Sequence, residues 1–161
     1  MKQVFVFLLI IVSLVLYSCD KNRVYEKNIR IPDAAWDRNN ILEFGTEIND
    51  LTLSYNFFVN IRNTTGYKSA NIYFFISTTF PSGEVAHDTL ECFLADVRGK
   101  WLGRGYGKLK ESHILFKSRF RFPQAGKYKF EVEQGMRVDT LYGITDMGIR
   151  IEKAEQLPGV N

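Results

Sequence analysis

The longest regular pattern of apolar and polar residues lies in the segment 51–62, where apolar side chains occupy every second position. Phe58 alone interrupts this alternation, which has the period of a β-strand and would be scattered around a helix. The segments 71–79 and 127–134 show the same alternation. We therefore predict three strands, each with one face turned toward a hydrophobic core.

Shorter apolar segments between turn residues bring the expected total to about eight strands. They lie at 41–44, 89–94, 101–107, 114–116 and 148–152. Proline and glycine mark a turn at 81–83, and 96–99 is typical of a hairpin turn. No long window has helical periodicity, and only 33–36 is expected to form a single helical turn. The pattern predicts an all-β antiparallel sandwich. Its topology is jelly-roll or immunoglobulin-like, because periodicity does not reveal which strands pair.

The amino terminus has the features of a lipoprotein signal peptide. A positive start at Lys2 precedes an apolar run over 4–17, shorter than the ~20 residues that span a bilayer. The sequence Leu16-Tyr17-Ser18-Cys19 then places an aliphatic residue three positions before a cysteine and a small residue just before it. This lipobox arrangement predicts cleavage before Cys19 and acylation of its thiol. An ordinary secretory signal is the alternative, but no small-x-small cleavage site lies nearby.

The expected organisation has four parts. A signal peptide at 1–18 is followed by a short tether at 19–28, because this stretch is polar and charged. The β-sandwich domain occupies 29–155, a length that suits one hydrophobic core, and 156–161 forms a carboxy-terminal tail.

Charge and cysteine content narrow the possible functions. A formal net charge of +3, evenly spread, gives no argument for binding nucleic acid or an anionic membrane surface. With Cys19 acylated, Cys92 is the one remaining thiol, so no internal disulfide is expected. We interpret Cys92 as a small buried residue on the same face as Leu90 and Leu94, with a reactive thiol as the alternative.

Candidate catalytic or metal-binding residues are few. The two histidines, His87 and His113, are far apart and have no second cysteine to help hold a metal. No Gly-x-Ser-x-Gly or His-Glu-x-x-His motif is present. Glu131 and Glu133 share one strand face, whereas glycosidases usually place paired carboxylates across a cleft. We therefore expect no enzymatic activity, no metal, no cofactor and no small-molecule substrate.

The most unusual local stretch is 101–107, in which Trp101 and three glycines share one face if the stretch is a strand. An aromatic ring from the opposite sheet, or a bulge, explains such glycines, and a ligand groove is the alternative. The segment 133–139 leaves a strand with exposed charge and is a second candidate surface. The residues assigned to a possible partner or ligand surface are Trp101, Arg104, Tyr106 and Arg137. Whether Asp88-Thr89 or Asp139-Thr140 serves as an O-glycosylation acceptor stays open.

Several segments, collinear over nearly the whole mature chain, together resemble GldH, a family of gliding-motility lipoproteins from Bacteroidetes. The matching segments are Ser18-Cys19-Asp20, Arg23-Val24-Tyr25-Glu26, Ile31-Pro32 with Trp36, Ser82-Gly83-Glu84-Val85, Asp88-Thr89-Leu90-Glu91-Cys92, Leu94-Ala95-Asp96, Gly99-Lys100-Trp101-Leu102-Gly103 with Gly105 and Gly107, Arg121-Phe122-Pro123 with Gly126, Tyr128 and Phe130, Glu131-Val132-Glu133-Gln134-Gly135-Met136-Arg137, and Gly148-Ile149-Arg150-Ile151-Glu152-Lys153.

The resemblance implies a lipid-anchored envelope protein that acts without enzymatic activity in the gliding-motility or type IX secretion apparatus. Its partners are then other envelope proteins of that machinery, and its lipid anchor holds it to a membrane. Similar proteins occur in bacteria that do not glide, so a part in envelope assembly or secretion fits equally. Because 20–23 contains one acid and two bases, we expect an outer-membrane protein that faces the periplasm.

Two other classes of function stay open. An envelope β-sandwich can bind glycan if aromatic rings such as Trp101, Tyr106, Trp36 or Tyr142 lie along one groove and stack on sugars. A hydrolase would require a carboxylate or cysteine site in a cleft.

Overall fold

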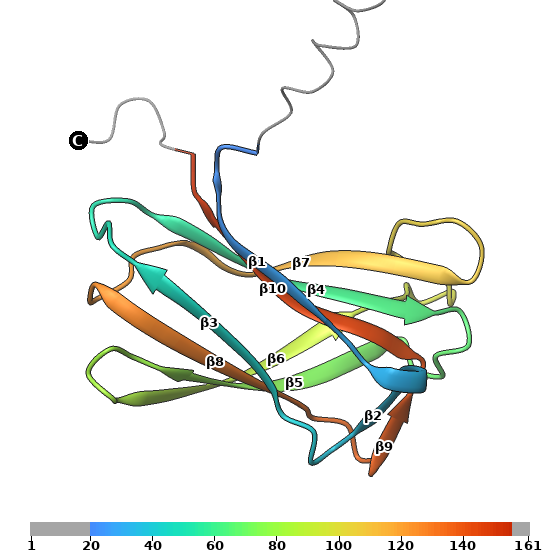
Figure 1. Cartoon of the computed structure of the whole chain (residues 1–161). Helices are drawn as coiled ribbons and strands as arrows, with labels where there is room; N and C mark the ends of the chain where they lie inside the picture. The colour runs from blue at the N-terminus through green and yellow to red at the C-terminus, as the bar shows by residue number, and fades with distance from the viewer. Residues whose placement is uncertain (1–19, 156–161) are drawn as a thin grey trace, which may run out of the picture.

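The computed structural model describes residues 20–155, which fold into antiparallel sheets without an α-helix (Figure 1). In chain order the elements are β1 (Arg23–Arg30), the 3₁₀ turn η1 (Pro32–Ala34), β2 (Ala35–Asp37), β3 (Leu42–Ile48), β4 (Tyr55–Thr64), β5 (Asn71–Thr79), β6 (Val85–Phe93), β7 (Leu109–Phe120), β8 (Gly126–Gln134), β9 (Thr140–Tyr142) and β10 (Ile144–Lys153). Within this described part of the chain, no helix is long and apolar enough to cross a membrane.

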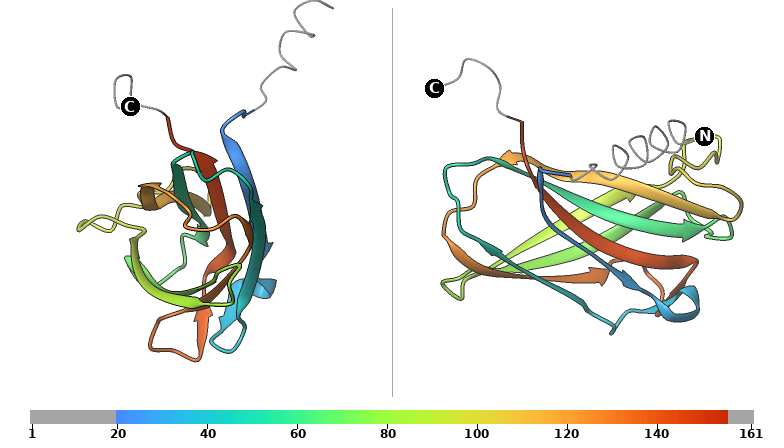
Figure 2. Two further views of the ribbon diagram at one scale, coloured as in Figure 1. Left: turned by 90° about the vertical axis from the view of Figure 1, so that its left-hand side faces the viewer. Right: turned by 45° about the horizontal axis from the view of Figure 1, so that its top comes forward.

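Two four-stranded sheets face each other, and a small third sheet lies at one end (Figures 1 and 2). Sheet A has the strand order β1-β10-β4-β7, and sheet C has the order β3-β8-β5-β6. Sheet B pairs β2 with β9. The expected all-β sandwich is confirmed. Apart from the hairpin β5–β6, successive long strands alternate between the two sheets, and the strand order within the sheets is that of a jelly roll rather than an immunoglobulin fold.

The core lies between sheets A and C and is filled by alternate residues of their strands. On β4, Tyr55, Phe57, Val59 and Ile61 are buried, as the alternation over 51–62 predicts. The first four residues of that predicted strand, 51–54, precede β4 and form a bend instead. Trp36 of β2 closes one end of the core, where its buried ring donates a hydrogen bond from Nε1 to the Asn40 carbonyl oxygen at 2.8 Å.

Most strand predictions are confirmed. The segment 71–79 coincides with β5, and 127–134 lies within β8. Both predicted turns form, since Gly83 N–H donates to the Phe80 carbonyl and Gly99 N–H to the Asp96 carbonyl, each at 2.9 Å. The single helical turn predicted at 33–36 is met only in part: η1 covers Pro32–Ala34, and Ala35 begins strand β2.

Two predictions are corrected. The stretch 101–107 is not a strand; it is part of the loop 94–108 between β6 and β7, with isolated bridges at Trp101 and Arg104. Most of the tether predicted at 19–28 is a strand instead, because Arg23–Arg30 form β1 and the sandwich begins at Arg23. Lys27 stands between Tyr25 and Ile29, which pack against the core, so the apolar and polar residues do not alternate and period two does not reveal this edge strand.

Candidate functional site

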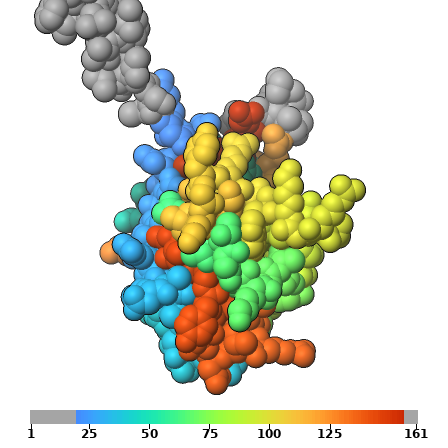
Figure 3. All heavy atoms as spheres, turned by 90° about the vertical axis from the view of Figure 1, so that its right-hand side faces the viewer, coloured from blue at the N-terminus to red at the C-terminus, as the bar shows by residue number. Residues whose placement is uncertain are grey.

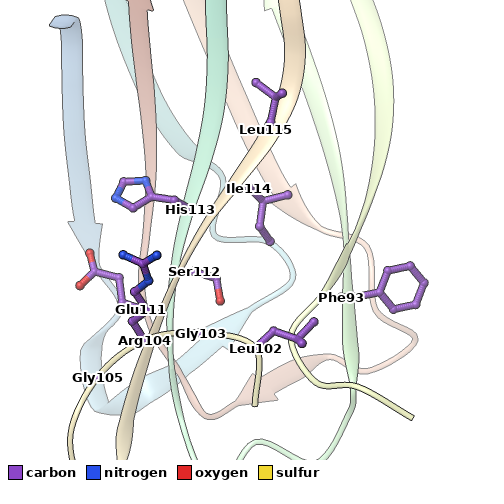
Figure 4. A pocket seen from close by; sticks show the side chains of 10 residues that line it. All are labelled: Phe93, Leu102, Gly103, Arg104, Gly105, Glu111, Ser112, His113, Ile114 and Leu115. Atoms are coloured by element: carbon purple, nitrogen blue, oxygen red, sulfur yellow. The ribbon is translucent and has the colours of Figure 1, made fainter. Parts of the chain in front are cut away.

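A groove of about 840 Å³ runs along the outer edge of β7, on the side of the sandwich where the edge strands β6 and β7 end the two sheets (Figure 4). Its lining residues are Phe93, Leu102, Gly103, Arg104, Gly105, Glu111, Ser112, His113, Ile114 and Leu115. Figure 4 shows Ser112 and Ile114 directed from β7 toward Leu102 and Phe93, and His113 directed to the opposite face.

The loop 94–108 forms one end of this groove and stands out from the flank of the molecule (Figure 3). It starts beside β6, where Leu102 N–H donates to the Leu94 carbonyl at 2.9 Å. It then crosses to β7, where Arg104 and Glu111 exchange two backbone hydrogen bonds of 2.8 and 2.7 Å. The loop therefore connects the edges of both sheets.

Two glycines allow this crossing. A Cβ atom on Gly103 would lie 2.7 Å from Ser112 Oγ and 2.9 Å from the Glu111 carbonyl oxygen. A Cβ atom on Gly105, where φ is +133°, would lie 2.6 Å from the Leu109 carbonyl oxygen. The glycines thus serve close approach to the backbone of β7, not to an aromatic ring of the opposite sheet.

The exposed apolar side chains are the groove's main chemical feature. Phe93, Leu102 and Leu115 are 61%, 57% and 48% exposed, although soluble domains usually keep such residues from clustering at the surface. For Phe93 and Leu115 the signal in the sequence is the runs 92–94 and 114–116, since three consecutive apolar residues on a strand must place one outside.

Charged residues frame both ends of the groove. The loop 94–108 carries four exposed basic residues and one acid, Asp96, whose Oδ1 accepts from the N–H groups of Arg98 and Lys100 within the turn. Farther along β7, Lys117 Nζ lies 2.7 Å from Oδ2 of Asp88 on β6, which joins the two sheets across the same side.

The four residues assigned to a surface from the sequence do not form one site. Arg104 lines the groove, and Trp101 packs partly buried against the core. Tyr106 is fully exposed in the loop, and Arg137 is exposed in the connection between β8 and β9, outside the groove lining. Among the rings considered for stacking on sugar, Trp36 is buried, and neither Trp101, Tyr106 nor Tyr142 lines the groove.

The amino-terminal end of the described chain is fixed to sheet A by Arg150 of β10. Its guanidinium donates to Glu26 Oε2 and Glu152 Oε2, each at 2.9 Å, and also to Asp20. Burial acts against the charged form, but the hydrogen bonds to Asp20 and Glu152 outweigh it and raise the pKa of Arg150. The hydrogen bond from Arg150 likewise lowers the pKa of Asp20. Asp20 follows Cys19 directly, and Cys19 itself lies outside the described residues.

Two further places hold side chains of reactive types, namely Cys92 and the pair of Ser77 and His87. Cys92 is buried, and burial raises its pKa to about 12, as expected for a structural thiol. Ser77 Oγ and His87 Nδ1 lie 2.9 Å apart on exposed side chains, with no carboxylate hydrogen-bonded to His87 among residues 20–155. The same residues contain no group of three or more side chains suited to a metal.

The structure thus defines a jelly-roll domain whose prominent surface feature is a groove at a strand edge, in a chain with a lipobox. The chain belongs to the GldH lipoprotein family, whose model matches residues 23–151. It is a gliding-motility lipoprotein of the cell envelope, held to a membrane by its anchor.

Two relatives cover nearly the full length. The chain is 37% identical to the "Gliding motility lipoprotein GldH homolog" of Christiangramia forsetii, over 96% of this chain and 99% of that protein. It is 34% identical to the "Gliding motility lipoprotein GldH" of Flavobacterium johnsoniae, over 92% of this chain and 96% of that protein.

Similarity to solved structures is weak. Dimeric latent PorU from Porphyromonas gingivalis matches with a TM-score of 0.35 and 10% identity, over 86% of this chain and 13% of that one. The galactotriose complex of TmCBM61 matches with a TM-score of 0.30 and 12% identity, over 82% and 71% of the two chains. At these TM-scores neither likeness bears on function.

Proposed function

We propose that this protein is a non-enzymatic component of the gliding-motility or type IX secretion apparatus and acts through contacts with other envelope proteins. The observation that carries the proposal is the groove beside β7, where Phe93, Leu102 and Leu115 expose apolar surface next to an unpaired strand edge. Apolar surface of this kind is typical of a protein contact. In bacteria that do not glide, the same contacts would serve envelope assembly or secretion.

The proposed location is the outer membrane, with the domain in the periplasm. Surface-exposed lipoproteins of this phylum tend to carry an acidic run after the acylated cysteine, whereas 20–23 has one acid and two bases. That single acid, Asp20, is engaged by Arg150. The stretch 20–23 therefore lacks an acidic run.

Co-purification of the full-length, carboxy-terminally tagged lipoprotein from detergent-solubilised envelopes tests the function. We expect gliding or secretion proteins in the eluate of the wild type and a marked loss of them for Leu115→Asp. Ile41→Asp is the matched control, because Ile41 is 44% exposed, close to the value for Leu115, and lies outside the groove. Recovery of the lipoprotein alone, or equal recovery with both variants, would contradict the proposal.

The glycan-binding alternative gains no support from the geometry. Its aromatic rings do not gather along the groove, and Trp36 belongs to the core. Recovery of polysaccharide-utilisation proteins in the same experiment would reopen it.

A further inference from the structure

The backbone of β7 has hydrogen-bonding groups directed into the groove. Glu111 uses both its N–H and its C=O to pair with Arg104 on that side. In a strand, both groups of one residue point the same way and those of alternate residues share the direction. The N–H and C=O of His113 and Leu115 therefore face the groove, on the side opposite β4. Among residues 20–155, no backbone group pairs with them there.

The loop 94–108 begins a fifth strand of sheet A and does not continue it. Arg104 occupies the position beside Glu111, and a continuing antiparallel strand would place Leu102 beside His113. Leu102 instead pairs with Leu94 near β6, so the chain leaves the edge. Leu102, Phe93 and Leu115 line the groove along this unpaired part of β7. Ser112, also in the lining, is buried, and its hydroxyl has no hydrogen-bond partner.

We propose that an extended segment of a partner protein adds to β7 as the next strand of sheet A, pairing with His113 and Leu115. Main-chain hydrogen bonds provide the affinity of such an addition, and pockets for alternate side chains provide its selectivity. An aliphatic side chain of the segment lies against Phe93 and Leu102. An acidic side chain lies near Arg104. That the partner belongs to the envelope machinery rests on the proposed function; the mode of binding does not.

Charge distinguishes this occupant from a second copy of the chain. The four basic residues of the loop, Arg98, Lys100, Arg104 and Lys108, have only Asp96 among them, and Asp96 is used within its own turn. They favour an acidic segment. The β7 strand of a second copy is itself basic, because Lys110, Lys117 and Arg119 outnumber Glu111. Pairing of two copies through β7 would therefore bring like charges together.

Residue-resolved hydrogen–deuterium exchange of the mature acylated lipoprotein in detergent tests the proposal. The probes are two pools of six-residue peptides, in which aliphatic residues alternate with Asp or Glu in one pool and with Lys or Arg in the other. We expect the acidic pool to slow exchange of the His113 and Leu115 amides about tenfold, while the basic pool leaves them unchanged.

Three variants sharpen the result. Arg104→Glu should reverse the preference between the pools. Arg98→Glu, with the same charge change on a turn residue outside the groove lining, should weaken the preference for the acidic pool without reversing it. His113→Pro should abolish the protection without unfolding, because proline is tolerated where its missing N–H faces a free edge.

Two outcomes would overturn the inference. One is unchanged exchange at His113 and Leu115 with both pools. The other is concentration-dependent protection of these amides without peptide, which would assign the edge to a second copy. The peptide measurement needs no native partner. If the acidic pool binds but the lipoprotein co-purifies with no other envelope protein, the proposed function is refuted and the inference about strand addition to β7 is retained.

Discussion

At the scale of single residues, Arg150 joins parts of the chain that are far apart in sequence. It contacts Glu26 and Asp20, which precede it by 124 and 130 positions. The sequence predicted neither contact, because alternation along a strand says nothing about which strand lies beside it. The buried side of Cys92 was predicted and is confirmed, since it depends only on the local period of two.

Replacement of Arg150 by Met should destabilise the fold by about 2 kcal/mol, because it leaves Glu26, Glu152 and Asp20 together without their cation. The Arg150 side chain is only 16% exposed. Urea unfolding measures the change. Arg62→Met is the control, since Arg62 is 42% exposed, pairs with Glu111 at 3.3 Å, and should cost less than about 1 kcal/mol.

The pH dependence of stability in the wild type and in Arg150→Met tests the contact between Arg150 and Asp20. Arg150 lowers the pKa of Asp20 below its ordinary value of 3.8. A carboxyl with a lowered folded pKa stabilises the fold above its unfolded pKa and loses that contribution as pH falls through the folded pKa. The difference in unfolding free energy between wild type and Arg150→Met should stay constant above about pH 5 and narrow below about pH 4. A constant difference down to about pH 2 would show that Asp20 is not held by Arg150.

Cys92 should resist thiol reagents while the domain is folded. Burial raises its pKa from 9.0 to about 12, so almost no thiolate forms at pH 8. Because the folded pKa is the higher one, the contribution to stability is complete below about pH 9 and is lost as pH rises toward 12. In the Cys19→Ser chain, a disulfide reagent at pH 8 should label Cys92 only in urea. Rapid labelling of the native protein would show a reactive thiol instead.

At the scale of elements, the strongest alternations gave the correct strands, and the errors have local physical causes. β5 coincides with 71–79 because nothing interrupts its pattern. β1 was missed because Lys27 interrupts the apolar positions of Tyr25 and Ile29. The stretch 101–107 was assigned to a strand because its glycines fall at every second position, as residues on one strand face do. The groove was missed as well, since it forms only where the loop 94–108 meets the edge of β7.

Replacement of Gly103 by Ala should lift the loop from β7 and destabilise the fold by about 1–3 kcal/mol, because the added Cβ overlaps Ser112 Oγ and the Glu111 carbonyl. Faster amide exchange at Arg104 and Glu111 should accompany the loss. Gly45→Ala is the control: its Cβ would meet only the Tyr128 carbonyl at 3.7 Å, an ordinary contact. Equal stability of the two variants would mean that the loop does not depend on this close approach.

At the scale of the whole molecule, the chain termini and the loop 94–108 lie at opposite ends of the sandwich. Lys153 N–H donates to the Asn22 carbonyl at 2.8 Å, and both ends of the described chain leave from the same side (Figure 1). β4 starts beside Lys153 and ends near Lys108. The rise per residue of a strand makes the distance between its two ends about 30 Å. The loop 94–108 therefore lies at the end of β4 opposite the end beside which the described chain begins.

A protease site in that loop tests which compartment it faces. We propose inserting the recognition sequence of a specific protease between Val97, which is fully exposed, and Arg98. If the domain faces the periplasm, added protease should not cut it in intact cells and should cut it after the outer membrane is permeabilised. A surface-exposed protein carrying the same site verifies that the protease is active on intact cells. Cleavage before permeabilisation would place the domain on the cell surface.

Cys19→Ala, made in parallel, should move the protein from the membrane to the soluble fraction; if it stays in the membrane, the anchor is not the lipid on Cys19.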